Sequence, residues 1–228
     1  MYTVANISIA LGLCSAAIIA IDLVRRPQQM TVMNVVWILS GLWSGIFGVW
    51  AYFAFGRNKT LRGVKMRSMD MKRPHWQSVA LSTLHCGAGC TLADIVGELL
   101  QLRVSLTVGG SLLFGGWIMD YVLALAFGVG FQYLAIRQMN PDMRSGKVIG
   151  RAVKADFLSL TAWQVGMCAW MSLAAFVLFA GGGPSRDSAQ FWFMMQIAMA
   201  VGFFCSYPVN AALIKYGVKS AMLSLIHI

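Results

Sequence analysis

Long apolar stretches constrain this chain more than any other feature. Six of them can be drawn, and each reaches or exceeds the roughly 20 residues that a helix needs to cross about 30 Å of hydrocarbon. They cover residues 3–24, 32–55, 78–100, 104–136, 155–179 and 189–214. Charged residues make up 11% of the chain, against roughly 25% in a soluble domain. The composition predicts an all-α membrane protein, because backbone polar groups in lipid must be satisfied within each helix.

The distribution of basic residues predicts how six transmembrane helices are oriented. With six crossings, fourteen of the 18 Lys and Arg residues fall on one face and four on the other. The four are Arg25, Arg26, Arg103 and Arg186. The positive-inside rule then places both termini and the two long loops in the cytoplasm, in a multi-pass protein of the inner (cytoplasmic) membrane. The long fourth segment is predicted to cross once, because splitting it would spoil this asymmetry.

The net charge of +10 comes from basic residues in these loops, and it does not indicate a nucleic-acid site. Lys and Arg residues beside helix ends fix orientation and contact anionic lipid. We therefore expect the partners to be the bilayer and, at the cytoplasmic loops, anionic lipid, with no nucleic acid. Scattered glycines in 104–136 allow close helix contacts within one chain or between copies, so the oligomeric state stays open.

A run of ten residues that begins at His85, HCGAGCTLAD, places soft ligands inside a membrane segment. Polar groups at this depth are costly and usually mark function. His85, Cys86 and Cys90 are candidate ligands for Cu(I) or Zn(II). On a regular helix the three side chains cannot coordinate one ion, because His85 points about 100° away from Cys86 around the helix axis. Binding would require the helix to unwind locally at Gly87 and Gly89. The alternative is that these small residues only pack helices together.

Carboxylates deeper in the membrane predict a path for a proton or cation. Asp94 lies 16 residues along the third segment and Asp120 lies 16 residues from the end of the fourth, so both are about 24 Å deep. They would share a proton or hold a cation, or else each makes a structural hydrogen bond to a neighbouring helix. Gln164 is predicted at the depth of His85 and Cys86, either lining the same cavity or hydrogen-bonding between helices.

The last two segments hold further polar and soft side chains. Asp156 opens the fifth segment, where an N-cap or helix-dipole role explains it, with Lys154 as an ion-pair partner. Plain packing is the commoner role of methionine in such segments. The additional soft ligands available there are Met167, Cys168, Met171, Met194, Met195, Met199 and Cys205.

Three functional hypotheses follow from these residues. No phosphate-cradling loop, zinc-protease motif or Ser-His-Asp arrangement can be recognised in the sequence, so a non-enzymatic role is favoured. The leading hypothesis is a membrane protein that binds or transports a soft metal ion such as Cu(I) or Zn(II), with or without proton coupling. The second is a thiol or quinone redox enzyme using Cys86 and Cys90, although thiols in the cytoplasmic half stay reduced. The third is a non-catalytic helical module.

Several stretches of the chain together carry a family resemblance. They are HCGAGCTLADIVGE from His85, DYVLA and FQYLAI in the fourth segment, VKADFLSLTAWQVGM from Val153, FWFMMQIAMAVGF from Phe191, and YPVNAALIKYGVKSAM from Tyr207. Over about residues 78–222 the chain thus resembles the prokaryotic membrane-protein family catalogued as domain of unknown function 4396. The resemblance implies a four-helix membrane domain and no particular activity.

The parts of the chain outside this resemblance are predicted separately. Residues 1–77 are expected to form an N-terminal transmembrane hairpin followed by a basic cytoplasmic loop. Residues 223–228, LSLIHI, match the in-frame translation of a common sequencing adapter, so we expect them to be foreign to the natural chain. His227 is therefore left out of the site.

Overall fold

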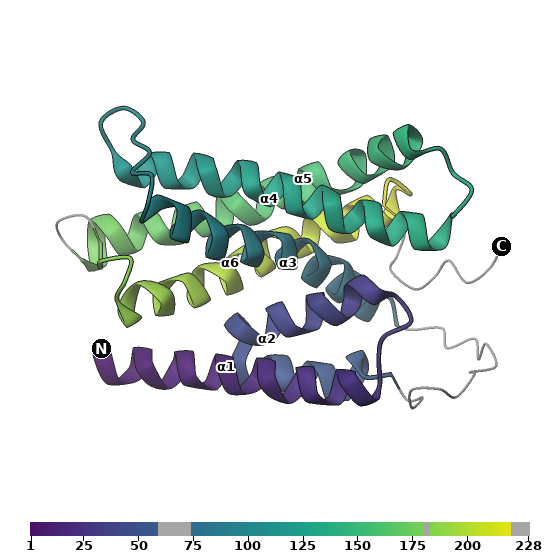
Figure 1. Ribbon diagram of the computed structural model, residues 1–228, viewed down its shortest axis with the longest axis horizontal. Coiled ribbons are helices and arrows are strands. Elements are labelled where there is room, and N and C mark those ends of the chain that lie inside the picture. Colours follow the sequence, from purple (N-terminus) through teal and green to yellow (C-terminus); the bar gives the residue numbers. More distant parts are fainter. Residues whose placement is uncertain (59–73, 180–182, 220–228) are drawn as a thin grey trace.

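The computed structural model is all-helical over the residues that it describes, 1–58, 74–179 and 183–219 (Figure 1). Its helices are α1 (Tyr2–Arg25), α2 (Thr31–Ala51) with the π-helical turn η1 (Tyr52–Gly56), α3 (His75–Gln101), α4 (Leu112–Met139), α5 (Ser145–Leu173) with the π-helical turn η2 (Ala174–Leu178), and α6 (Ala189–Lys215). Among the described residues, six helical stretches are long and apolar enough to cross a membrane. This confirms the predicted class. Most of the first basic loop, and residues 223–228, lie outside the described residues.

α3 is the central helix of the bundle. Its apolar window is 83% buried, compared with 28–44% for the other five helical stretches. Two glycines explain how closely its neighbours approach. A Cβ on Gly89 would lie 2.8 Å from the Cα of Gly128 on α4, and a Cβ on Gly87 would overlap the Trp163 ring of α5. Polar side chains on α3 are therefore enclosed by protein rather than by lipid.

α2 does not cross the bundle, because the chain reverses inside it at Gly45. This residue has φ 53° and ψ −131° between two helical halves, a conformation that glycine adopts readily. Gln28 donates from Nε2 to the carbonyl of Gly56 (3.1 Å), and the Trp37 ring centroid lies 5.3 Å from that of Tyr52. A straight helix of 26 residues would separate its ends by about 39 Å. The stretch is therefore a re-entrant helical hairpin (Figure 1).

The break in α2 leaves a backbone carbonyl inside the bundle, and α6 satisfies it. Gln196 donates from Nε2 to the carbonyl of Leu42 (2.7 Å), and its Oε1 accepts from the Ser8 hydroxyl of α1 (2.7 Å). The Ser44 hydroxyl donates to the carbonyl of Ser40 (2.5 Å). Such a break is tolerated at membrane depth only where protein groups replace the lost hydrogen bonds. Broken helices of this kind recur in transporters, where they border the substrate path.

The reversal changes how α1 and α6 are placed relative to one another. Ser8, near the start of α1, contacts Gln196, near the start of α6, so both helices start at the same end of the bundle. The start of α1 and the end of α6 consequently lie at opposite ends of the bundle (Figure 1), whereas six full crossings would place them at the same end. The sequence did not indicate this reversal, because residues 32–55 have the length and hydropathy of a crossing helix.

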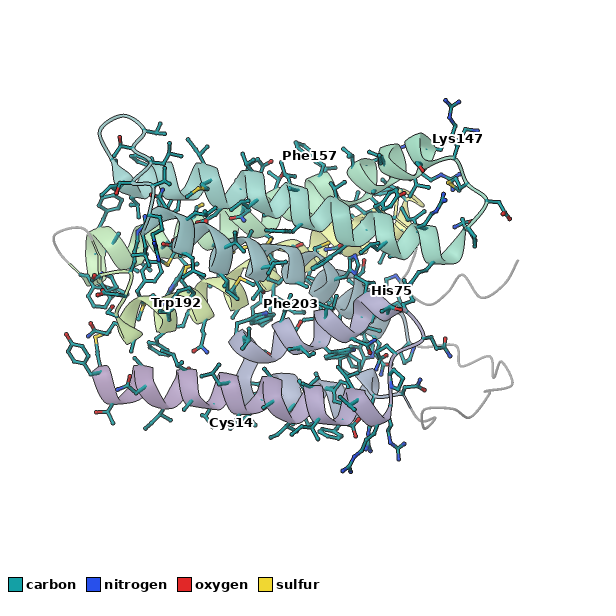
Figure 2. All side chains as sticks on the ribbon, in the orientation of Figure 1. Cys14, His75, Lys147, Phe157, Trp192 and Phe203 are labelled. Atoms are coloured by element: carbon teal, nitrogen blue, oxygen red, sulfur yellow. The ribbon has the colours of Figure 1, made fainter. Side chains whose placement is uncertain are left out.

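The charge distribution agrees with the corrected arrangement. Arg25 and Arg26 lie at the end of the bundle that Lys147 marks in Figure 2, where the long basic loops begin and end; we call it the basic end. Within the part of the chain that the structure describes, Arg103 and Arg186 are the basic residues at the opposite end, which we call the Arg186 end. The positive-inside rule then predicts that the basic end faces the cytoplasm.

The fourth and fifth segments begin at different residues from those predicted. Gly109 and Gly110 have φ 60° and 77° and form a turn, so the fourth segment is one helix that begins at Leu112. α5 begins at Ser145, ten residues earlier than the apolar pattern indicates. Asp156 therefore lies about three turns inside α5 and is not the predicted N-cap.

Substituting Gly45 is expected to destabilise the re-entrant hairpin. No atom lies within 4 Å of a Cβ built on Gly45, so Gly45→Ala meets no clash and changes only backbone strain, about 1–3 kcal/mol. Gly130→Ala is the matched control, because Gly130 has equally open surroundings without a positive φ. Reversible unfolding in mixed detergent micelles measures both. An equal effect of the two substitutions would contradict the assigned break.

Candidate functional site

The polar residues of α3 form one row along the bundle. Cys86, Cys90, Asp94 and Glu98 are spaced four residues apart, which places them on one side of the helix. Their exposed fractions are 0%, 0%, 3% and 5%. The row ends in two different polar environments, one around Cys86 towards the basic end and one around Glu98 towards the Arg186 end.

The environment of Cys86 is a buried ion-pair network. The Lys219 ammonium Nζ lies 2.7 Å from Asp156 Oδ1, 2.9 Å from Cys86 Sγ and 3.0 Å from Asn210 Oδ1. The side chains of Lys219 and Asp156 are fully buried. Burial by itself lowers the pKa of Lys219, but Asp156 and Cys86 beside it raise that pKa further, to above its usual value. The 2.7 Å contact between Lys219 and Asp156 is accordingly a buried ion pair.

Lys219 reaches the network because the chain turns back after α6. Gly217 has φ 68°, and the backbone N–H groups of Val218 and Lys219 donate to the Leu213 carbonyl (2.9 and 3.1 Å). A left-handed glycine after the last turn is a common helix termination. Sequence reasoning missed Lys219 because it follows the last apolar segment and looks like an orientation charge.

The structure does not group the three predicted metal ligands. The His85 ring faces Phe131 of α4, with 6.4 Å between ring centroids, and neither of its nitrogens has a hydrogen-bond partner among the described residues. Cys86 contacts α5 and the segment after α6, whereas Cys90 lies in the apolar core. α3 is a continuous helix through this region. Within the described part of the chain, no three His, Cys, Asp or Glu side chains are arranged to hold a metal ion.

The structure does bring the two deep aspartates together. A Cβ on Gly97 would overlap Asp120 Oδ1, so Asp120 lies about one helical turn from the level of Asp94. Asp94 interacts electrostatically with Asp120 and Glu98. Both oxygens of Asp94, and Oδ1 of Asp120, are buried without a hydrogen-bond partner among the described residues. Carboxylates in this state are costly, which is typical of a site that receives a proton or cation.

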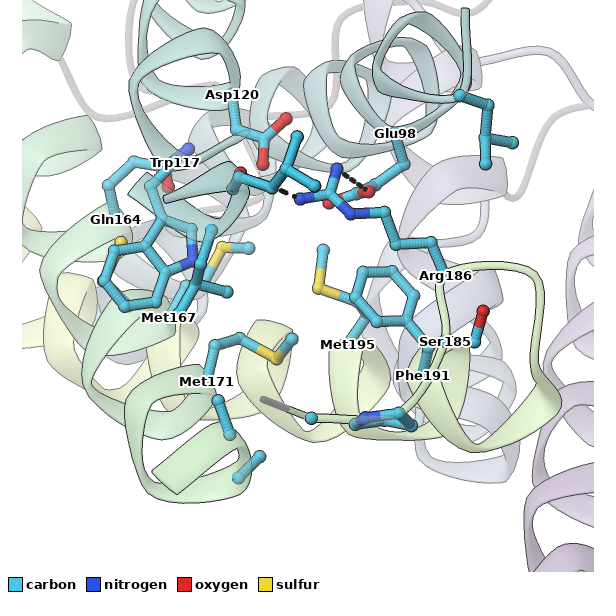
Figure 3. A pocket seen from close by; sticks show the side chains of 18 residues that line it. Glu98, Trp117, Asp120, Gln164, Met167, Met171, Ser185, Arg186, Phe191 and Met195 are labelled. Atoms are coloured by element: carbon cyan, nitrogen blue, oxygen red, sulfur yellow. Dashed lines mark hydrogen bonds and ion pairs between the residues drawn. The ribbon is translucent and has the colours of Figure 1, made fainter. Parts of the chain in front are cut away.

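A pocket of about 360 Å³ lies at the Arg186 end, between α3, α4, α5 and α6 (Figure 3). Its polar lining includes Glu98, Asp120, Gln164 and Arg186. Arg186 reaches across the pocket and donates to Glu98 Oε2 (2.7 Å) and to the Leu112 carbonyl (3.2 Å). Gln164 therefore lies with Asp120, because α5 is longer than predicted, and not at the depth of Cys86.

Sulfur atoms line the apolar side of the same pocket. Met167 and Met171 lie one turn apart on α5, and Met195 comes from α6. Figure 3 shows the thioether ends of all three pointing toward the pocket interior. Cys168 also lines it. Thioether and thiol groups are ligands that select soft ions such as Cu(I).

The fold and the site define a polytopic helical membrane protein with an enclosed polar row, a re-entrant helix and a sulfur-lined pocket. The chain belongs to the family described as domain of unknown function DUF4396, whose match covers residues 75–219. The polar row, the Lys219 network and the pocket all lie inside the matched region. No curated protein and no solved structure matches the chain.

Proposed function

We propose that this protein binds a soft monovalent cation, Cu(I), in the pocket at the Arg186 end and transports it along the polar row of α3. The observation that carries the proposal is the convergence of three thioethers, Met167, Met171 and Met195, on a pocket that also contains the buried carboxylate of Asp120. Thioethers supply soft, neutral ligands, and the carboxylate supplies the charge that a monovalent cation needs in a low-dielectric site.

The formal charge of the pocket also favours a cation. Arg186 is already paired with Glu98. Asp120 is therefore the pocket carboxylate without a basic partner among the described residues, and once deprotonated it supplies a negative charge beside the methionines. Zn(II) is less suited to this pocket, because zinc sites are built from Cys, His and carboxylate ligands in a tetrahedral set.

The row of α3 provides the continuation of the path. Beyond Asp120, the next polar groups are the unpartnered Asp94, then Cys90 and Cys86, each about 6 Å apart along the helix. Two carboxylates as close as Asp94 and Asp120 favour sharing one proton, so entry of a cation would release a proton and couple the two ions. The re-entrant α2 hairpin favours transport over storage of the ion, because discontinuous helices are common in transporters.

Binding of Ag(I), a redox-stable substitute for Cu(I), tests the proposal. The purified protein in detergent is titrated against a competing chelator, beside a variant with Met167→Leu, Met171→Leu and Met195→Leu. Leucine conserves volume and apolar character at little cost in packing. We expect about one tight Ag(I) per wild-type chain and a loss of affinity of about 100-fold or more in the variant, as soft ligands are removed.

The matched control replaces three other methionines that are equally buried but do not line the pocket, Met33, Met194 and Met199. This control variant should bind as the wild type does. Equal Ag(I) affinity in all three proteins would refute the pocket. The redox hypothesis predicts that Cys86 and Cys90 matter and the methionines do not, and the packing hypothesis predicts no binding at all.

A further inference from the structure

Acceptor atoms surround the ammonium of Lys219 in the way that ligands surround a bound cation. Its acceptors come from three different helices: Cys86 on α3, Asp156 on α5 and Asn210 on α6. An ammonium group has three protons to donate, so its hydrogen-bonding capacity is filled. The side chain is fully enclosed.

The acceptors are held in place by bonds that do not involve Lys219. The Asn210 amide donates from Nδ2 to the carbonyl and the hydroxyl of Ser206 (3.1 and 3.0 Å), which leaves its Oδ1 pointing at the ammonium. The Ser206 hydroxyl donates to the Ser159 carbonyl (2.8 Å), and the Ser159 hydroxyl lies 3.2 Å from Cys86 Sγ. The shell is therefore preorganised by α3, α5 and α6.

The shell has ligand capacity that Lys219 does not use. Asp156 Oδ2 is buried and has no hydrogen-bond partner among the described residues. The neighbouring His85 ring, also without a partner there, interacts electrostatically with both Asp156 and Lys219. A free ion could thus take more contacts than the ammonium takes.

Lys219 belongs to the turn after α6, and this turn can move away from the three acceptors without any helix unfolding. Lys219 follows α6 by four residues, after the Gly217 turn, and the backbone N–H groups of Gly217, Val218 and Lys219 donate to carbonyls of the last turn of α6. In contrast, its acceptors sit on long helices in the bundle interior. Moving the turn would open the shell toward the basic end.

We propose that Cys86, Asp156 and Asn210 form a monovalent-cation site, and that Lys219 is a tethered cation that occupies it when no free ion is present. The site takes a singly charged cation, because one carboxylate balances one charge. In the transport function proposed above, on which this step rests, the returning ammonium displaces the transported ion at the basic end.

Thiol labelling of Cys86 tests this site without any metal. The full chain carries Cys14→Ser, Cys90→Ala, Cys168→Ser and Cys205→Ser, so that Cys86 is the remaining cysteine, and two reagents are compared: cationic aminoethyl and anionic sulfonatoethyl methanethiosulfonate. With Lys219 present, Cys86 is expected to react slowly with both. In Lys219→Ala, the rate at which Cys86 reacts with the cationic reagent should rise about 100-fold. This rate should also be about ten times the rate with the anionic reagent.

Two further variants keep the outcome decisive. Adding Asp156→Asn to Lys219→Ala removes the site charge, so the preference for the cationic reagent should disappear while the reaction stays fast. Should Lys219→Ala fail to fold, Asn210→Leu serves instead, since it removes one acceptor and leaves the ion pair; it should raise the cationic rate about tenfold. Unchanged rates, or fast labelling without charge preference, overturn the cation site and leave the Ag(I) result at the methionine pocket unaffected.

Discussion

Asp156→Ala is expected to lower the free energy of unfolding by about 3–5 kcal/mol. The substitution leaves the fully buried ammonium of Lys219 without a counter-charge, and removing one partner of a buried pair costs much more than the pair contributes when intact. Reversible unfolding of the protein in mixed detergent micelles measures the change.

Two comparisons separate this effect from a general loss of packing. Asp156→Asn with Lys219→Met removes both charges and should recover most of the lost stability. Arg57→Met breaks a partly exposed ion pair with Asp22, in which the Arg57 side chain is 35% exposed. Its effect on the free energy of unfolding should be much smaller than that of Asp156→Ala, because solvent screens exposed pairs. If Asp156→Ala lowered the free energy of unfolding as little as Arg57→Met does, the assignment of a buried ion-pair network at Cys86 would be wrong.

Asp120→Asn should weaken Ag(I) binding by about 100-fold. A carboxylate about 5 Å from a monovalent cation contributes roughly 3 kcal/mol at an effective dielectric constant of 20, and this is close to two factors of ten in affinity. The amide conserves the shape of the side chain, so the effect is one of charge. Competition titration of the purified protein measures the affinity.

Asp187→Asn is the control for the charge of Asp120. Asp187 lies at the same end of the bundle but is exposed and accepts a hydrogen bond from Ser185, and solvent screens its charge. Its substitution should change the affinity by less than about twofold. Equal effects of the two substitutions would mean that the ion does not bind beside Asp120.

The sequence predicted the helical membrane class because the apolar segments are long and few residues are charged. It also predicted that Asp94 and Asp120 lie at nearly the same depth, since counting residues along antiparallel helices is enough for that. The reversal at Gly45 was missed because hydropathy does not distinguish a crossing helix from two half-helices of the same total length. One positive φ changes the side on which α1 begins.

The two clusters of the site were not predictable for a different reason. Asp156 lies at the very start of the fifth apolar segment and Lys219 lies beyond the end of the sixth, so each looked like an interfacial charge. Their pairing depends on the extra turns of α5 and on the Gly217 turn after α6. Likewise, the pattern of methionines on α5 and α6 does not show which of them point into one pocket, because that depends on helix rotation.

Uptake of Cu(I) into liposomes that contain the purified protein tests the central claim most directly. An enclosed fluorescent Cu(I) indicator reports the entry of ions, with empty liposomes as the baseline. The account predicts uptake by the wild type and by the Met33→Leu, Met194→Leu, Met199→Leu control, and uptake near the baseline for Met167→Leu, Met171→Leu, Met195→Leu. Uptake at the wild-type rate by the pocket variant, or no uptake by the wild type, would contradict it.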